Sequence, residues 1–399
     1  MSKTYVRKVP ADKSGIWAGK RLLLSSLDIE LTERCNNACS HCYINRPQED
    51  EAARNAELSA AEILEVLKEA ASLGCLSVRF TGGEPLVRDD FEEIYLAARK
   101  LGLKVAIATN ATRITPRLAE ILARVPPLLP VEITLYGSTR ETYEAVSRRR
   151  GSFDAAVRGV TALKERRLPF VITGTVLSSD DREIEAFDRL VRAKFFQERD
   201  PARVFALNLR ARRDDEGKNE RIKALRPSPD RQYRILSRNK AAFRRDMARL
   251  FSRFAGPQGD RLFACEAGTG SACLDSYGRL QTCVLLRHPD TTYDLKKGSL
   301  KDALTVFFPS LREMRAKDPD YLVRCAHCFL SDLCDQCPAR SWMESGTLDA
   351  PIEYFCRTSH RIARGMGLLG DAENAWDVPD REKRIEEFVK RGGRNGPQC

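Results

Sequence analysis

LDIELTERCNNACSHCY, the stretch at residues 27–43, joins a strand pattern to a loop that carries three cysteines. The strand is predicted at Leu27–Leu31, where apolar and acidic residues alternate, so one of its faces should be polar or line a cavity. Cys35, Cys39 and Cys42 follow with the spacing C-x3-C-x2-C. Three thiolates in a short loop can bind three irons of a four-iron cluster and leave the fourth iron without a protein ligand.

A zinc knuckle is the alternative for this loop, with His41 as its fourth ligand. Zinc motifs usually pair C-x2-C with a second such pair farther along the chain, whereas here the cysteines follow a strand end. We therefore expect an iron–sulfur cluster with one open iron at this place.

Beyond the loop, strand and helix patterns alternate up to about residue 210. The further predicted strands are Ser77–Thr81, Lys104–Thr109, Val131–Tyr136, Phe170–Leu177 and Val204–Leu209, and most are as apolar as buried parallel strands are. The helices predicted between the strands are Ser59–Leu73, Asp89–Leu101, Pro116–Arg124, Ser152–Arg166 and Arg182–Lys194. These units predict an α/β fold, a partial (β/α)6 barrel of the TIM type. In such a barrel, the loops that follow the strands build the active site.

The second strand ends in the tight sequence Gly82-Gly83-Glu84-Pro85. Two adjacent glycines let the backbone approach a ligand closely, and the neighbouring carboxylate can pair with an ammonium group. Taken alone, these residues fit a simple turn equally well. Their position one unit after the cysteine loop favours a binding role.

A second group of cysteines lies in the C-terminal part of the chain. Its members are Cys265, Cys273, Cys283, Cys325, Cys328, Cys334, Cys337 and Cys356. Eight thiolates are enough for two four-iron clusters with no open position. Two zinc sites of four thiolates each are the alternative, since C-x2-C pairs also suit zinc.

Composition limits the class of protein. Hydrophobic residues make up 42% of the chain, no stretch is long and apolar enough to span a bilayer, and the N-terminus lacks the apolar core of a secretory signal. We therefore expect a cytoplasmic protein without a membrane partner, in which the clustered cysteines, eleven of the 13, bind metal rather than form disulfides. The net charge of +11 fits a solvated basic surface or an acidic partner, and we expect no nucleic-acid partner.

Changes in composition divide the chain into five segments. They are an N-terminal extension at 1–21, the barrel at 22–215, a charged helical bridge at 216–264 with a helix at Asp230–Arg253, a small cysteine-rich iron–sulfur domain at 265–360, and a C-terminal helix and tail at 361–399. The domain at 265–360 is expected to have little apolar core and to need metal to fold.

C-x3-C-x2-C with an aromatic residue after it, at the end of the first strand of a partial barrel and followed by GGEP, resembles the radical S-adenosylmethionine (SAM) superfamily. The resemblance implies that SAM binds the open iron and is cleaved to methionine and a 5′-deoxyadenosyl radical, which abstracts hydrogen from a substrate. It also implies that Tyr43 lies near the adenine and that Gly82, Gly83 and Glu84 hold the amino group of SAM. Later strand ends give weaker candidates for SAM contacts, namely Asn110, Ser138 and Arg210.

The C-terminal cysteine pattern resembles the SPASM domain of radical SAM peptide maturases, although its last pair is spaced by two residues where that domain usually has three. The resemblance implies two auxiliary 4Fe–4S clusters and so three clusters in all. The inner one would be bound by Cys265, Cys273, Cys283 and Cys337, and the outer one by Cys325, Cys328, Cys334 and Cys356. Some SPASM proteins leave an iron open at the place of Cys273. We expect Cys75 to be an inert core thiol and Cys399 to be unligated.

The same resemblance favours a ribosomally made precursor peptide as substrate, with flavodoxin or ferredoxin as electron donor. Sulfatase maturation is disfavoured, because Val284 stands where those relatives carry an aspartate base. About 25 residues precede the barrel, too few for a leader-binding domain, so we expect a separate protein or the SPASM region to bind the leader. A small-molecule substrate such as a tetrapyrrole is the second possibility, and a non-catalytic electron carrier is disfavoured because it needs no open iron.

Overall fold

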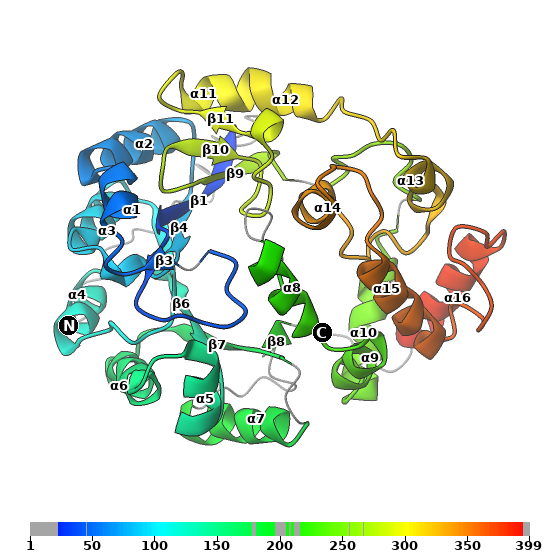
Figure 1. Ribbon diagram of the computed structural model, residues 1–399, viewed down its shortest axis with the longest axis horizontal. Coiled ribbons are helices and arrows are strands. Elements are labelled where there is room, and N and C mark those ends of the chain that lie inside the picture. Colours follow the sequence, from blue (N-terminus) through cyan, green and yellow to red (C-terminus); the bar gives the residue numbers. More distant parts are fainter. Residues whose placement is uncertain are drawn as a thin grey trace, which may run out of the picture.

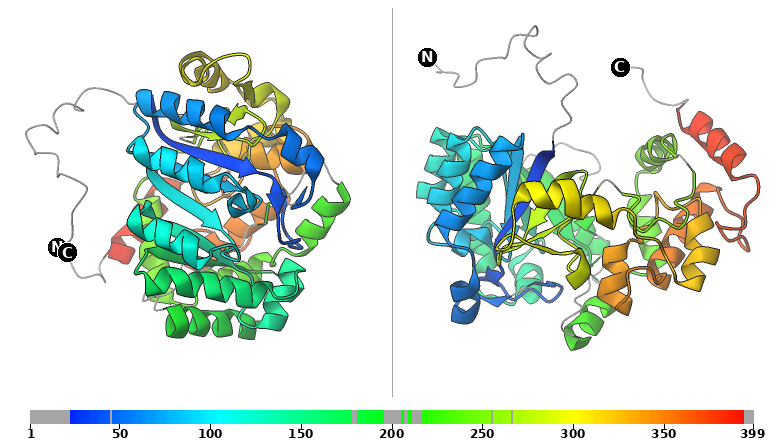
Figure 2. Two further views of the ribbon diagram at one scale, coloured as in Figure 1. Left: turned by 90° about the vertical axis from the view of Figure 1, so that its left-hand side faces the viewer. Right: turned by 90° about the horizontal axis from the view of Figure 1, so that it is seen from above.

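The computed structural model describes residues 23–44, 46–177, 181–195, 205–206, 209–210, 216–254, 256–265 and 267–393. Six parallel strands form the predicted barrel sheet, in the order β1-β4-β5-β6-β7-β8 (Figures 1 and 2). Their bounds are Leu24–Thr32, Ser77–Gly82, Lys104–Thr109, Leu128–Leu135, Phe170–Thr175 and Phe205–Ala206. Each pairs with its neighbour in parallel. The α/β class and the partial barrel are thus confirmed, while residues 204, 207 and 208 of the sixth predicted strand lie outside the described residues.

Helices cover the outer face of this sheet (Figure 1). The predicted ones are α2 at Ala60–Ser72, α3 at Phe91–Lys100, α4 at Pro116–Arg124, α6 at Ser152–Glu165 and α7 at Asp181–Phe195. Two further helices, α1 at Glu51–Ala56 and α5 at Arg140–Ser147, lie in the connections. Helix α2 begins at a capping box in which Ser59 and Glu62 satisfy each other's backbone N–H groups.

The first strand has the two faces that its alternation predicts. Leu27 and Ile29 are buried in the apolar core that β1 shares with the covering helices. Asp28 and Glu30 point to the opposite face, the inside of the barrel, because side chains alternate along a strand. Polar groups therefore line the interior of the barrel beside the cysteine loop.

The first part of the cysteine-rich region extends the barrel sheet. Strand β9 at Gly270–Leu274 pairs in parallel with β1, and the sheet continues through β10 at Arg279–Gln281 and β11 at Tyr293–Asp294. The short helices here are η3 at Pro289–Thr291, α11 at Leu300–Asp302, the π-helical turn η4 at Ala303–Phe307 and α12 at Phe308–Leu311. Leu274, Leu280, Leu300 and Phe308 are all buried in the core of the barrel. The expectation of little core at 265–360 was therefore wrong for this part.

Part of the rest of the C-terminal half has an apolar core of its own, whereas Tyr321, Ala326 and Ala339 join the core of the barrel. Its helices are α8 at Glu216–Ala224, α9 at Pro229–Leu236, α10 at Lys240–Phe251, α13 at Pro319–Val323, η5 at Cys325–His327, α14 at Pro338–Ser345, α15 at Glu353–Met366 and α16 at Arg381–Gly393. Phe251, Phe329, Ile362 and Phe388 meet in this second core, although they come from four separate segments. This part lies beside the barrel, on the right in Figure 1.

Two predicted boundaries differ from the structure. The single helix predicted at Asp230–Arg253 is two helices, since Asn239 begins α10 by accepting a hydrogen bond from the backbone N–H of Ala242 at 3.0 Å. Helix α15 runs through the predicted boundary at residue 360 and packs against α9. The bridge and the C-terminal helices therefore fold together.

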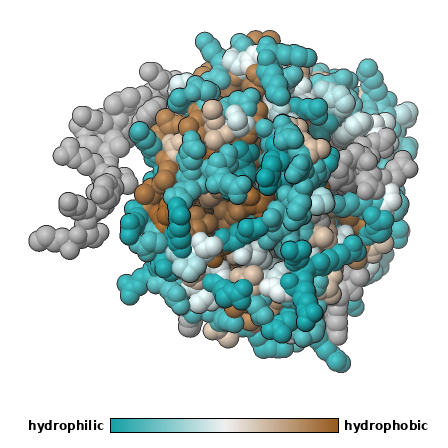
Figure 3. All heavy atoms as spheres, turned by 60° about the vertical axis from the view of Figure 1, so that its left-hand side comes forward, coloured by the Kyte–Doolittle hydropathy of each residue, from teal (hydrophilic) through white to brown (hydrophobic). Residues whose placement is uncertain are grey.

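The two ends of the barrel strands differ in character. Large apolar side chains are exposed near the starts of the strands, among them Leu23, Leu76 and Leu128, and Figure 3 shows apolar residues gathered on one side of the molecule. The predicted site residues lie at the opposite ends of the strands. No helix within the described ranges is both long and apolar enough to cross a membrane.

Candidate active site

The first three cysteines lie together at the carboxyl end of β1. Cys35 ends the short strand β2 (Arg34–Cys35), which pairs with β3 (Arg46–Pro47). Burial raises the pKa of Cys35, and the nearby Glu84 carboxylate and the Cys42 and Cys39 thiols raise it further. Such mutual effects require thiols that are close to one another, so the structure brings the predicted triad together.

The glycine turn after β4 packs directly under this loop. The backbone N–H of Gly83 donates to Thr32 at 2.7 Å, and that of Glu84 donates to Arg34 at 2.9 Å. A Cβ atom on Gly83 would lie 2.4 Å from the Arg34 carbonyl oxygen, and one on Gly82 would lie 2.2 Å from that of Thr32. Both residues must be glycine because the turn touches the backbone of residues 32–34, the segment that leads into Cys35.

We expect Gly83→Ala to weaken iron binding at the first site. The added Cβ meets backbone atoms that cannot rotate away, so the turn must shift, at a cost of about 1–3 kcal/mol. Anaerobically reconstituted protein should then hold fewer irons than the wild type. Gly370→Ala is the matched control, since its nearest contact is the flexible end of the Glu373 side chain at 3.3 Å. Equal iron in both variants would contradict the packing role of Gly83.

Glu84 is fully buried and ties the turn to the next strand. Its carboxylate accepts hydrogen bonds from the hydroxyl of Thr109 at 2.8 Å and from the backbone N–H groups of Asn110 at 2.8 Å and Leu86 at 3.1 Å. Leu86 lies in the short helix η2 (Pro85–Val87). Burial raises the pKa of Glu84 to about 7, and these donors oppose the shift. Glu84 therefore holds β4, β5 and the cysteine loop in one arrangement, whichever ligand it also contacts.

Asn110 reaches the cysteine loop from the end of β5. Its side-chain amide donates to Asn36 at 3.0 Å and lies 3.9 Å from the Cys35 sulfur. Thr112 completes the group, because it donates to Asn110 and accepts from Asn36. This predicted site residue thus supports the loop between Cys35 and Cys39.

The remaining predicted residues lie on the far strands. Ser138 follows β6 and donates both its backbone N–H, at 2.5 Å, and its hydroxyl, at 2.9 Å, to Glu183 of α7, beside a cavity of about 600 Å³. Tyr43 is held by Arg210, whose guanidinium carbon lies 5.1 Å from the centre of the tyrosine ring. Tyr43 and Arg210 therefore meet, whereas Ser138 contacts α7 and is separate from them.

Charged side chains inside the barrel escaped the sequence analysis. Arg79 of β4 pairs with Glu132 of β6 at 2.7 Å and lies 3.7 Å from Asp28 of β1, and all three are about one-third exposed. The signal available in the sequence was a charged residue inside an otherwise apolar strand. They give the barrel interior two carboxylates and one guanidinium.

Arg287 connects the cysteine loop to the C-terminal half. It lies four residues after Cys283, and its guanidinium donates to Glu33 at 2.7 Å and to Glu30. Both carboxylates are buried, and Glu33 also accepts hydrogen bonds from Tyr277 and Arg46. One arginine thus joins the segment that leads into Cys35 to the segment that follows Cys283.

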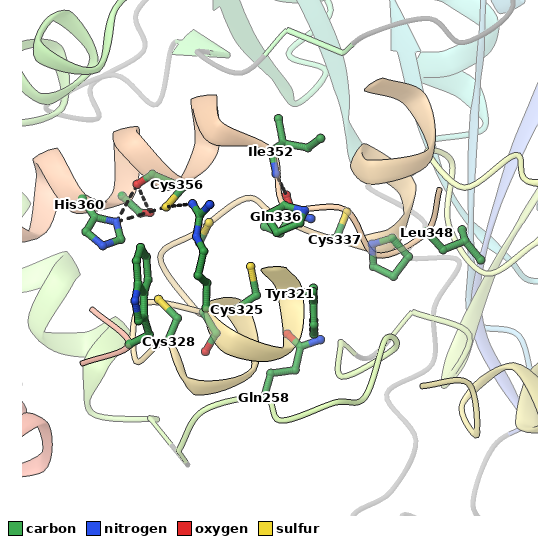
Figure 4. Close-up of a pocket in the computed structure, with 17 residues that line it drawn as sticks. Gln258, Tyr321, Cys325, Cys328, Gln336, Cys337, Leu348, Ile352, Cys356 and His360 are labelled. Carbon is green, nitrogen blue, oxygen red and sulfur yellow. Dashed lines mark hydrogen bonds between the residues drawn. The ribbon is translucent and has the colours of Figure 1, made fainter. Parts of the chain in front are cut away.

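Five of the C-terminal cysteines line one pocket. They are Cys325, Cys328, Cys334, Cys356 and Cys337, and in Figure 4 Cys337 lies to the right of Cys325, Cys328 and Cys356. Burial and, to a smaller extent, the other three thiols predicted for the outer site raise the pKa of Cys328 to about 12. The structure thus brings together the four residues predicted for the outer site.

The four cysteines predicted for the inner site form a looser group beside β1. Burial raises the pKa of Cys283, and the thiols of Cys337 and Cys265 add to this. Cys273 is fully buried in β9 opposite Asp28 of β1, and among the thiols its pKa is raised by Cys283. Cys283 therefore lies near each of the other three thiols. Within the described ranges, no three His, Cys, Asp or Glu side chains are placed to hold a single metal ion.

Of the two cysteines predicted to be unligated, the structure describes only Cys75. Cys75 is buried in the core, and its thiol donates to the carbonyl oxygen of Ser77 at 3.2 Å, as expected of an inert core thiol. Cys399 lies outside the described residues, as does the N-terminal extension at 1–21.

Known proteins resemble this chain in sequence and in fold. Fe-coproporphyrin III synthase of Methanosarcina barkeri is 35% identical over 165 residues, 41% of this chain and 40% of that protein. Mycofactocin maturase MftC of Mycobacterium tuberculosis is 39% identical over 136 residues, 34% of this chain and 33% of that protein. The chain therefore spans well under half the length of these relatives.

One solved structure shares the fold over most of the chain. SuiB of Streptococcus suis bound to its precursor peptide SuiA superimposes with a TM-score of 0.59 at 17% identity, over 88% of this chain and 82% of SuiB. The likeness therefore extends beyond the barrel into the cysteine-rich half. The model of the radical SAM superfamily matches residues 29–191, the segment that holds the cysteine triad and the glycine turn. The barrel segment of this chain is therefore similar to radical SAM domains.

Proposed function

We propose that this protein cleaves SAM reductively and uses the resulting radical to modify a peptide. The observation that carries the proposal is the triad Cys35, Cys39 and Cys42, fixed at the carboxyl end of β1 by the glycine turn beneath it. In a barrel of this kind, that end of the sheet is where active sites lie.

The donor set suits a four-iron cluster with one open iron. Three thiols are close together. The buried carboxylate nearby, Glu84, accepts hydrogen bonds from other groups of the chain. A cluster bound here would supply the electron that splits SAM into methionine and a 5′-deoxyadenosyl radical. The residues of the chain would position SAM. The backbone of Gly82 and Gly83 and the remaining acceptor site of Glu84 would hold its amino group, and Tyr43 would bind its adenine. Asn110 and Ser138 remain the candidates for its ribose and carboxylate.

The two C-terminal thiol groups would hold two auxiliary 4Fe–4S clusters. The grouping of the thiols in space supports the ligand sets, with Cys325, Cys328, Cys334 and Cys356 on the outer cluster. The inner cluster would take Cys265, Cys283 and Cys337, with Cys273 as its fourth ligand.

A precursor peptide is the substrate we propose. SuiB binds such a peptide and shares the fold, and MftC is a maturase. The Methanosarcina relative keeps a tetrapyrrole as the second candidate. If coproporphyrin stimulates the release of 5′-deoxyadenosine and a peptide encoded beside the gene does not, the tetrapyrrole would be favoured.

Two partners complete the proposal. An external reductant must deliver the electron to the first cluster, and we propose a flavodoxin or ferredoxin for this. A separate protein is proposed to bind the leader of the peptide.

The iron content tests this account of three clusters. Anaerobically reconstituted wild type should hold about twelve irons and Cys328→Ala about eight, since each cluster contains four. Cys328→Ala should still release 5′-deoxyadenosine without substrate, because its first cluster is intact, but it should modify peptide poorly.

Cys75→Ala is the matched control, because this thiol is buried in the core away from all three groups. It should keep about twelve irons, the content of three four-iron clusters. Tightly bound zinc in the C-terminal half would refute the auxiliary iron–sulfur clusters, and unchanged iron in Cys328→Ala would refute the assignment of the outer one.

A further inference from the structure

An arginine is built into the wall of the outer thiol pocket. Arg324 directly precedes Cys325, and its Nη2 lies 3.4 Å from the sulfur of Cys356. The same nitrogen lies 2.6 Å from a carboxylate oxygen of Glu353, and the guanidinium carbon stacks 5.0 Å from the centre of the Trp376 ring. A carboxylate on one side and an aromatic ring on the other thus hold a positive charge against a thiol that is predicted to ligate iron.

The Nε group is a second donor of this guanidinium. It is buried without a hydrogen-bond partner among the described residues, and it lies on the same edge of the planar group as Nη2, the nitrogen that contacts Cys356. A sulfur atom at this place could accept a hydrogen bond from this buried N–H group.

Resting on the function proposed above, we propose that Arg324 sets the reduction potential of the outer cluster by hydrogen bonding to its sulfur atoms. Reduction adds one electron and so one negative charge to a cluster. A fixed cation and N–H donors at the sulfurs stabilise the reduced state more than the oxidised state and raise the potential. Arg324 is a positioning residue in this role, since it acts through the sulfur ligands, and Trp376 and Glu353 hold it in place.

The test is a redox titration of the reconstituted full-length protein, reduced stepwise with dithionite and followed by electron paramagnetic resonance. The signal that is missing from Cys328→Ala identifies the outer cluster. Arg324→Gln removes the charge, and Arg324→Lys keeps the charge but loses the planar pair of donors. Arg361→Gln is the matched control, because Arg361 also contacts one carboxylate, Asp230, and one ring, Tyr233, but no thiol.

We expect Arg324→Gln to shift the one-electron equilibrium at least tenfold toward the oxidised state, which is a fall of about 59 mV. Arg324→Lys should shift it in the same direction by less, and Arg361→Gln should leave it unchanged. An intact outer cluster with an unchanged or higher potential in Arg324→Gln would overturn the role of Arg324 and leave the proposed function standing. A wild type without iron at these four thiols would overturn both the role of Arg324 and the outer cluster, while SAM cleavage at the first cluster would still be tested by the release of 5′-deoxyadenosine.

A second variant keeps the test decisive if Arg324→Gln does not assemble the outer cluster. Trp376→Leu retains the guanidinium but removes the ring that holds it against Cys356. Its outer cluster should also titrate at a lower potential than that of the wild type. An unchanged potential in this variant would overturn the proposal.

Discussion

Arg287→Met should destabilise the protein by about 3–5 kcal/mol, the range measured when one partner of a buried ion pair is removed. The variant leaves the carboxylates of Glu30 and Glu33 buried without the cation that they share. Because Arg287 joins the segment before Cys35 to the one after Cys283, we expect iron to be lost from both sites as well. Anaerobic urea unfolding followed by circular dichroism measures the first effect, and an iron assay the second.

Arg46→Met is the control for this variant. Arg46 also pairs with Glu33, but its side chain is 42% exposed, so water can replace it. Its loss should cost about 1 kcal/mol or less. Equal destabilisation by the two variants would contradict the central position of Arg287.

The deficit of Arg287→Met should also depend on pH. Burial raises the pKa of Glu30 to about 7, while Arg287 opposes the shift. A carboxyl group with a raised pKa in the folded state contributes stability that is present at low pH and is lost as the pH rises through that value. Without Arg287 the charged form is less favourable still. The deficit should therefore be larger at about pH 8 than at about pH 6, and a deficit that grows toward low pH would contradict this.

The barrel could be predicted because its signals are local. Lys104–Thr109 and Pro116–Arg124 have the predicted bounds, since an apolar run marks the strand and Thr115 with Pro116 marks the start of the helix. The cysteine triad and GGEP were recognisable for the same reason, because their spacing along the chain carries the chemistry.

The contacts that hold the site together could not be predicted, because they join residues far apart in sequence. Arg287 and Glu33 are separated by 254 positions, and nothing near either residue indicates the other. The apolar residues of the C-terminal half, such as Phe329 and Phe388, are likewise scattered. Their number in any short window is small, which is why the sequence suggested a region without a core.

Replacing Cys35, Cys39 and Cys42 together by alanine should abolish SAM cleavage. The three thiols are the protein ligands proposed for the first cluster, and nothing in the C-terminal half is proposed to bind SAM. The variant should lose about four irons and keep about eight in the auxiliary sites, since each cluster holds four. Retained iron shows that a loss of cleavage comes from the first site and not from unfolding of the whole chain.

The most direct measurement is the release of 5′-deoxyadenosine from SAM, under anaerobic conditions with dithionite and without substrate. Wild type and Cys75→Ala should release it, and the triple cysteine variant should release none while it keeps its auxiliary iron. Release from the triple variant at the rate of the wild type, or no release from wild type that holds about twelve irons, would contradict the proposal that this barrel cleaves SAM.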